Sequence, residues 1–242
     1  MPRPGRACSS YLLRTPERRV LLDAGPGALS KLTLATDYAK LDAIVVSHMH
    51  ADHFFDLVPF RYALKYGPKR RTQRMPLWLP PGGSASLDAL RRAVSPDAPA
   101  SFFDDVFEIA EYDPLQGLLF GDLRLGFAQT RHFVSAFAVR AEAGGASVVY
   151  SADTAPCNAV IDLARDAAIF LCEAALGLST EAGERGHTSA AEAGEMARQA
   201  GVDRLVLTHY GVAEPGDALV EAAKRQFQGP VVLADDGMDF PV

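Results

Sequence analysis

The feature that most constrains the fold is the alternation of short apolar segments with amphipathic ones. Ten segments have the composition of β-strands: residues 9–14, 18–23, 41–47, 75–80, 123–130, 135–143, 146–151, 167–172, 203–208 and 230–235. Several are apolar at nearly every position, as strands covered on both faces are. Helical segments over residues 53–66, 86–94, 188–200 and 216–227 lie between them. This alternation predicts an α/β fold.

Turn and cap residues refine that prediction. Gly144-Gly145 predicts a hairpin between the strands at 135–143 and 146–151, so the sheets are expected to be mixed rather than purely parallel. Ser189 and Glu192 form a capping-box pattern at the start of the third helix, and Gly201 supplies its stop. No repeat, low-complexity tract or linker divides the sequence. We therefore expect one domain over residues 1–242.

Composition excludes several classes of protein. No apolar run reaches the roughly 18 to 20 residues needed to cross a bilayer, and the apolar part of MPRPGRACSSYLL is too short for a signal peptide, so we expect a cytoplasmic protein that does not engage membranes. The three cysteines, Cys8, Cys157 and Cys172, have no Cys-x-x-Cys spacing. Their pattern favours small buried side chains over a disulfide framework or a cysteine zinc site.

The net charge of -6 argues against a general nucleic-acid binder. There is one local exception, a basic cluster of Lys65, Lys69, Arg70, Arg71 and Arg74. Such a cluster can sit beside an anionic substrate. A solvated surface loop explains the same residues and is the favoured interpretation.

The segment SHMHADH, residues 47–53, carries the strongest chemical signal. It follows an apolar strand and places His48, His50, Asp52 and His53 within six residues. Imidazole and carboxylate groups are the ligands that zinc and related divalent ions prefer. A coincidental cluster in a polar loop is the alternative, and the rest of the chain disfavours it.

Three more candidate ligands each follow a predicted strand: His132, Asp153 and His209. Strand ends in α/β sheets open onto a common crevice, where sites are built. Taken singly, His132 can be a surface-loop residue, Asp153 an N-cap and His209 a histidine near the core. Five of the six histidines, however, lie at strand ends or in the 47–53 segment, and this concentration favours one metal site.

The pattern His-x-His-x-Asp-His at 48–53, followed by His132, Asp153 and Leu-Thr-His at 207–209, resembles the metallo-β-lactamase superfamily over nearly the whole chain. The resemblance implies a four-layer αββα sandwich of two mixed β-sheets flanked by helices. It also implies two divalent metal ions, zinc first, with manganese or iron as alternatives. One metal is then held by His48, His50 and His132, and the other by Asp52, His53 and His209, with Asp153 bridging them.

Three further segments resemble the RNase Z-like branch of phosphodiesterases within that superfamily. They are Cys172-Glu173-Ala174, Gly186-His187-Thr188-Ser189 and LADDGMDF at 233–240. The resemblance implies that Glu173 and His187 lie beside the metals and assist catalysis. The alternatives are a strand-end surface carboxylate for Glu173 and a loop histidine near a helix N-terminus for His187.

This branch implies a phosphodiesterase in which a hydroxide bridging two metals, formed because the metals lower the pKa of water toward ~7, attacks phosphorus. Asp52 would orient or deprotonate this nucleophile, and His187, steadied by Glu173, would contact the phosphoryl group or protonate the leaving oxygen. RNase Z carries a tRNA-gripping arm between the positions of His132 and Asp153, where this chain has only twenty residues. We therefore expect a small phosphodiester, such as a cyclic nucleotide or short oligonucleotide, rather than tRNA.

Other activities remain open on the same metal platform. A lactone, thioester or β-lactam carbonyl is a possible substrate. A di-iron redox enzyme is less favoured, because such enzymes usually have Glu where this chain has His50 and carry a flavin domain. A non-catalytic scaffold is disfavoured because no expected ligand is replaced. A homodimer is possible, as the commonest assembly among soluble proteins that associate.

Overall fold

The computed structural model describes residues 5–179, 183, 185–211 and 215–242; the first four residues of the N-terminal segment lie outside this range. The described chain divides into two compact units. We call residues 7–113 the first unit, and residues 114–242 together with 5–6 the second unit. Each unit has its own sheet and its own hydrophobic core. One domain over residues 1–242 stays a prediction.

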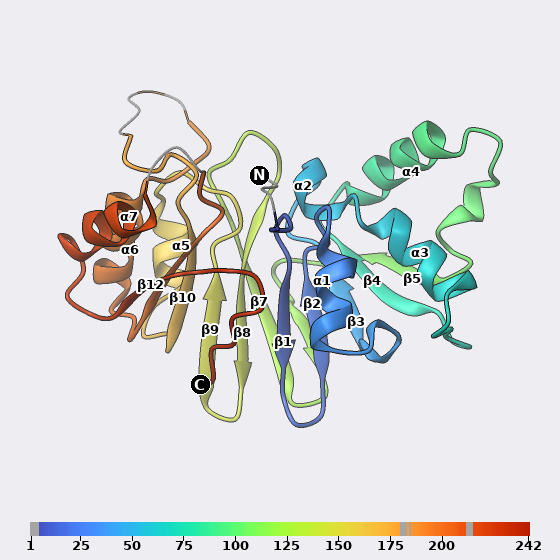
Figure 1. The fold of residues 1–242 in the computed structure, drawn as a ribbon, viewed down its shortest axis with the longest axis horizontal. Helices are drawn as coiled ribbons and strands as arrows, with labels where there is room; N and C mark the ends of the chain where they lie inside the picture. The colour runs from blue at the N-terminus through green and yellow to red at the C-terminus, as the bar shows by residue number, and fades with distance from the viewer. Residues whose placement is uncertain (1–4, 180–182, 184, 212–214) are drawn as a thin grey trace. The chain divides into compact units, whose positions relative to one another are not determined.

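The first unit is built on a five-stranded sheet (Figure 1). Its strands, in spatial order, are β1 (Tyr11–Arg14), β2 (Arg19–Leu22), β3 (Ala43–Val45), β4 (Met75–Leu79) and β5 (Phe107–Glu111). β1 is antiparallel to β2, and the other pairs are parallel. The sheet is therefore mixed, and the carboxyl ends of β2, β3 and β4 lie along one edge.

The helical elements of this unit are α1 (Ala28–Ala35), η1 (Tyr38–Lys40), α2 (Ala51–Phe54), α3 (Leu57–Tyr66), α4 (Gly83–Val94) and η2 (Ala100–Phe102). The predicted helix over 53–66 is two pieces, α2 and α3. The amide of Asp56 donates to Ala24 O at 2.9 Å instead of continuing the α2 ladder, and its carboxylate accepts from the amides of Gly27 and Leu29 near the start of α1. Leu57, Phe60 and Leu64 of α3 then pack into the core.

The second unit is built on a seven-stranded sheet. Its strands, in spatial order, are β12 (Val231–Leu233), β11 (Leu205–Thr208), β10 (Ile169–Glu173), β9 (Ala146–Tyr150), β8 (Phe137–Ala143), β7 (Leu123–Gln129) and β6 (Leu118–Phe120). β9 to β12 are parallel, and β6 to β9 are antiparallel. The predicted hairpin joins β8 to β9: Gly144 and Gly145 have φ of 58° and 85°, the positive values that a two-residue turn of this type needs.

Helices α5 (Asn158–Leu163), α6 (Ala190–Ala200) and α7 (Gly216–Lys224) belong to this unit (Figure 1). The predicted capping box of α6 is present, and Gly201 ends the helix with a φ of 66°. Burial raises the pKa of Glu192, but hydrogen bonds from Ser189 and Arg185 outweigh it and hold the pKa below its ordinary value. Gly194 permits close packing, because a Cβ at this position would lie 2.4 Å from a backbone carbonyl oxygen of α7.

The predicted class, α/β with two mixed sheets and helices, is confirmed. All ten predicted strands form, while β5, β6, α1 and α5 were not predicted. Cys172 is fully buried, and burial raises the pKa of its thiol; the described residues include all three cysteines, and none forms a disulfide. Across the described residues, we find no helix with both the length and the apolar character that crossing a membrane requires.

Candidate metal centre

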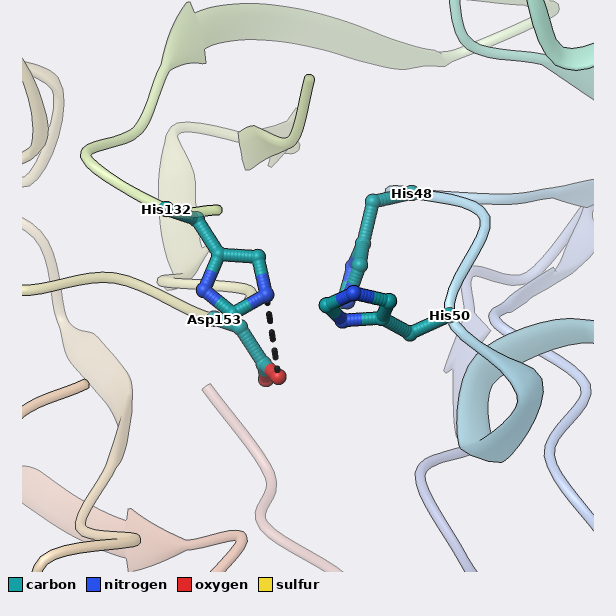
Figure 2. A group of neighbouring side chains, drawn as sticks. All are labelled: His48, His50, His132 and Asp153. Atoms are coloured by element: carbon teal, nitrogen blue, oxygen red, sulfur yellow. Dashed lines mark ion pairs between the residues drawn. The ribbon is translucent and has the colours of Figure 1, made fainter. Parts of the chain in front are cut away.

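In the first unit, the segment 47–53 forms a cluster of side chains directly after β3. His48 and His50 lie on the loop, and Asp52 and His53 lie in the short helix α2. The ring centroid of His48 lies 5.0 Å from that of His50 and 4.0 Å from that of His53. Figure 2 shows the His48 and His50 rings side by side on this loop. The four residues predicted from this motif are therefore grouped within one unit.

Asp23 holds these histidines in place. It follows β2, is fully buried, and accepts hydrogen bonds from Ser47 N–H at 2.7 Å and Ser47 Oγ–H at 2.9 Å. Its Oδ2 lies 2.7 Å from Nδ1 of His53, and Ser47 Oγ lies 3.0 Å from Nδ1 of His48. A histidine whose Nδ1 is held by such a partner binds a metal through Nε2. Both rings are thus oriented for metal binding, and both are fully buried.

In the second unit, three histidines converge on one carboxylate, that of Asp153, which follows β9. His132 follows β7, His209 follows β11, and His187 precedes α6. His132 Nε2 lies 3.8 Å from Asp153 Oδ2, the pair marked by the dashed line in Figure 2. His209 Nδ1 lies 3.5 Å from the other oxygen, Oδ1. Asp153 therefore presents a different oxygen to each of these two histidines.

These spacings suit a metal. Two ligand atoms bound to one zinc ion at about 2.1 Å in tetrahedral geometry lie about 3.4 Å apart. The ligand atoms of Asp153, His187 and His209 all lie within 4.8 Å of one another, and Asp153 is 2% exposed. A buried carboxylate among imidazoles fits a divalent cation by both charge and donor type. The residues of this unit therefore fit the expected ion.

Gly186 fixes His132. Its carbonyl oxygen lies 2.7 Å from Nδ1 of His132, which leads the ring to present Nε2 toward Asp153. A Cβ at position 186 would lie 2.8 Å from that Nδ1 and 2.7 Å from the Phe133 ring. Only glycine therefore lets the chain pass this close to the histidine.

Glu173, at the end of β10, is not the surface carboxylate that was the alternative, because it is fully buried. Its Oε1 accepts from Thr154 N–H at 2.8 Å and lies 2.9 Å from Nδ1 of His187. Its Oε2 accepts from the amides of Ala175 at 3.0 Å and Thr188 at 3.2 Å. One carboxylate thus joins the segment after Asp153 to the segment that carries His187.

Backbone conformation marks the same positions. Of the four described non-glycine residues with a positive φ, three lie just after strands: Asp23 at 60°, Ala152 at 50° and His209 at 48°; the fourth, Asp166 at 54°, precedes β10. The first holds His53, the second precedes Asp153, and the third is itself a predicted ligand. The left-handed region is costly for such residues and recurs at functional sites. The strained backbone thus points to the predicted residues.

Sequence reasoning missed Asp23 and gave Ser47 and Gly186 no role of their own. Asp23 ends the predicted strand 18–23, much as Asp153 follows another, but it lies in none of the motifs that carry the resemblance. Ser47 was included in the motif without a role. The contact between Gly186 and His132 joins positions 54 residues apart, and no local signal shows it.

Comparisons with known proteins identify the family of the chain. Residues 18–210 match the Beta-lactamase superfamily domain. "Probable metallo-hydrolase YhfI" of Bacillus subtilis is 31% identical, with 98% of this chain and 93% of the relative covered. The crystal structure of YhfI matches with a TM-score of 0.86 at 28% identity, over 98% of this chain and 93% of that one.

Two further relatives extend the comparison. "Uncharacterized protein Rv1339" of Mycobacterium tuberculosis is 33% identical, over 96% of this chain and 86% of the relative. "Ribonuclease Z" of Methanothermobacter thermautotrophicus is 29% identical, over 100% of this chain and 93% of the relative. The chain therefore belongs to the β-lactamase superfamily of metallo-hydrolases.

Proposed function

We propose that this protein is a binuclear metal-dependent phosphodiesterase that acts on a small phosphodiester, such as a cyclic nucleotide or a short oligonucleotide. The observation that carries the proposal is the pair formed by His187 and the buried Glu173. It places an oriented imidazole, 26% exposed, with Nδ1 3.9 Å from the carboxylate of Asp153. Such a pair can protonate a leaving alkoxide or donate to a phosphoryl oxygen, and the resemblance of the segments that carry Glu173 and His187 to RNase Z-like phosphodiesterases favours the diester over a carbonyl substrate.

The proposed metal centre is the one that the resemblance to the superfamily implies. We assign His48, His50 and His132 to one ion, Asp52, His53 and His209 to the other, and Asp153 to both. The two oxygens of Asp153, each near a different histidine, support the bridging role. The oriented rings of His48, His53 and His132 support the ligand roles. Zinc is the first choice for this donor set, and manganese or iron is the alternative.

Two divalent ions, when bound, would lower the pKa of water and neutralise negative charge on the phosphoryl oxygens. The side chains of the chain supply the remaining functions. Asp52, whose side chain is 31% exposed, would orient the attacking water and accept its proton. His187, held at Nδ1 by Glu173, would use its other ring nitrogen to donate to the phosphoryl group or the leaving oxygen.

The choice of a small substrate rests on the segment between His132 and Asp153. It consists chiefly of β8, the Gly144-Gly145 turn and β9. A hairpin of this length leaves no residues for an arm that grips a large RNA. Resemblance to a ribonuclease Z over the whole chain supports phosphodiester chemistry, and the short hairpin favours a diester smaller than tRNA.

The test is hydrolysis of bis(p-nitrophenyl) phosphate by the zinc- or manganese-loaded protein, beside a β-lactam and a lactone. We expect diester turnover that Asp52→Ala abolishes and that His187→Ala lowers by about 10²- to 10⁴-fold. Asp162→Ala, which removes a carboxylate exposed on α5, should leave the rate unchanged. Turnover of the lactone or lactam alone, unaffected by His187→Ala, would replace the proposal with a carbonyl hydrolase.

A further inference from the structure

The basic cluster found in the sequence belongs to a longer segment of one charge. Residues 57–87 contain six Lys or Arg side chains and no Asp or Glu. The chain as a whole has a net charge of -6, so this concentration runs against its composition. The segment comprises α3, the loop 67–74 that joins α3 to β4, β4 itself and the start of α4.

A cavity of about 140 Å³ lies at the loop 67–74. It is lined by Lys65, Arg70, Arg71, Thr72, Gln73 and Arg74, together with Leu64, Asp105 and Val106. A cavity of this size has room for several waters, and hence for one phosphate group. Its lining combines cations with the hydroxyl and amide donors of Thr72 and Gln73, a donor set that suits an anion.

The charged side chains that line this cavity carry a net positive charge. Asp105 is the one carboxylate among the lining residues, and it is shared between Lys65 and the buried Arg61, whose Nη2 lies 2.6 Å from it. Arg71 is fixed by hydrogen bonds to the carbonyl oxygens of Ala39 at 2.9 Å and Leu41 at 2.6 Å. Arg70 and Arg74 are both exposed. Four lining cations against one shared carboxylate leave an excess of positive charge.

An aromatic surface adjoins the cavity. Tyr62 and Tyr66 lie one turn apart on α3 and are 44% and 61% exposed. Their rings are stacked, with centroids 6.2 Å apart and an interplanar angle of 29°. Lys65, which lines the cavity, has its Nζ 5.5 Å from the Tyr66 ring. A cationic cavity beside an exposed aromatic ring is the combination that binds the phosphate and the base of a nucleotide.

The cavity and the loop that carries His48 lie at opposite ends of the parallel strands of the five-stranded sheet. β3 and β4 are parallel; His48 follows the end of β3, whereas the loop 67–74 precedes the start of β4. The five residues of β4 span about 16 Å. Figure 1 shows α3 running away from α2 toward the end of the sheet at which β4 starts. The basic cluster therefore does not belong to the His48 loop.

We propose that this cavity binds the phosphate group of a nucleotide, with Tyr66 stacked on the base. The nucleotide is either free in solution or part of a single strand, because both present the same phosphate and base. The site uses none of the residues assigned to the metal centre. It adds a nucleotide-binding surface to the protein whatever the substrate of that centre is.

The test uses the metal-loaded protein and a short fluorescein-labelled phosphorothioate oligothymidylate, which resists hydrolysis, with binding measured by fluorescence anisotropy at several salt concentrations. We expect Arg70→Ala/Arg74→Ala to weaken binding about tenfold or more. The slope of log K against log salt should fall in magnitude by about 0.7, since the cavity holds one phosphate and each phosphate contact on a single strand contributes about 0.7. Tyr66→Ala should weaken binding about fivefold or more. Competition by AMP identifies a site for a single nucleotide, and salt-dependent binding that AMP does not displace identifies a strand.

The matched control is Lys224→Ala/Arg225→Ala, which removes two exposed cations at the end of α7. It should bind like the wild type. Equal losses in the two double variants, or an unchanged slope in Arg70→Ala/Arg74→Ala, would overturn the proposal. Hydrolysis of bis(p-nitrophenyl) phosphate by Arg70→Ala/Arg74→Ala should match the wild type. Failure of this second site is therefore distinguishable from failure of the proposed catalytic function.

Discussion

Replacement of Glu173 by glutamine tests how far the site depends on one buried carboxylate. The carboxylate oxygens face three backbone amides, those of Thr154, Ala175 and Thr188, and Nδ1 of His187. A glutamine has one acceptor oxygen, which serves two of these four groups. Its NH₂ group must then face the other two, at least one of which is a backbone N–H.

The cost follows from that count. In the better orientation the NH₂ group faces Thr154 N–H and His187, and the histidine changes tautomer to accept from it. One buried backbone N–H is then left without an acceptor, which costs about 1–3 kcal/mol, and charge-assisted hydrogen bonds are lost as well. We expect a total of about 2–4 kcal/mol. For a chain of this size this lowers Tm by roughly 5 to 15 °C.

Thermal unfolding followed by circular dichroism measures the change. Glu195→Gln, an exchange of the same type at a partly exposed position of α6, is the control and should change stability by about 0.5 kcal/mol or less. A Tm for Glu173→Gln within 2 °C of the control, as an order-of-magnitude limit, would refute the reasoning. It would show that the carboxylate does not join these segments in solution.

Three further predictions follow from the same structure. Asp23→Ala removes the partner of His53 Nδ1 and the acceptor that holds Ser47, which is the partner of His48, so metal affinity should fall by about 10- to 100-fold in competition with a chromophoric chelator. Gly194→Ala should destabilise the protein by about 1–3 kcal/mol in urea unfolding, although alanine favours helices, because the new methyl group would clash with an α7 carbonyl. Glu192→Gln should be less stable than wild type near neutral pH. That difference should shrink as the pH falls through the lowered pKa of Glu192, below 4.5, where the wild-type carboxylate is protonated too.

Each of these three predictions has a control variant or a result that would contradict it. Gly126→Ala, at a position where a Cβ would meet nothing within 4 Å, should be neutral; an equal cost at both glycines would contradict the packing argument. Asp37→Ala, at an aspartate that caps η1, should leave metal affinity unchanged. A stability difference for Glu192→Gln that persists or grows at acid pH would show that the carboxylate acts through something other than its ionised hydrogen bonds.

Much of the fold was predictable because strands covered on both faces leave a plain signature. Segments such as 41–47 and 167–172 are apolar at most positions, and both form strands. β6 spans only three residues, and β5 alternates apolar with acidic or small side chains, so neither carried a strong local signal. The break between α2 and α3 was not predictable, because it depends on hydrogen bonds between Asp56 and the backbone of residues 24, 27 and 29, which are distant in sequence.

The candidate site, too, was predictable from the sequence only in part. The motif of predicted metal ligands was visible because its histidines are close in sequence and metal binding needs those residue types. Glu173 and His187 came from resemblance alone, and the structure now gives them a contact of 2.9 Å. Asp23 acts on residues that follow it by about two dozen positions or more, through a contact that only the folded sheet creates. A homodimeric, cytoplasmic enzyme stays a prediction.

The left-handed backbone at Asp23, Ala152 and His209 has a consequence for how such a protein changes over generations. At roughly 1 kcal/mol each, the three conformations together cost about 3 kcal/mol, a sizeable share of the 5–15 kcal/mol by which domains are stable. Glycine would relieve the strain at each position, so selection for thermal stability alone favours it there. Selection for the predicted site opposes it, because glycine would remove the side chains of Asp23 and His209 and would loosen the backbone just before Asp153. Laboratory evolution for heat tolerance should therefore be screened for activity at every round, since these stabilising glycine substitutions lie at or beside the predicted metal ligands.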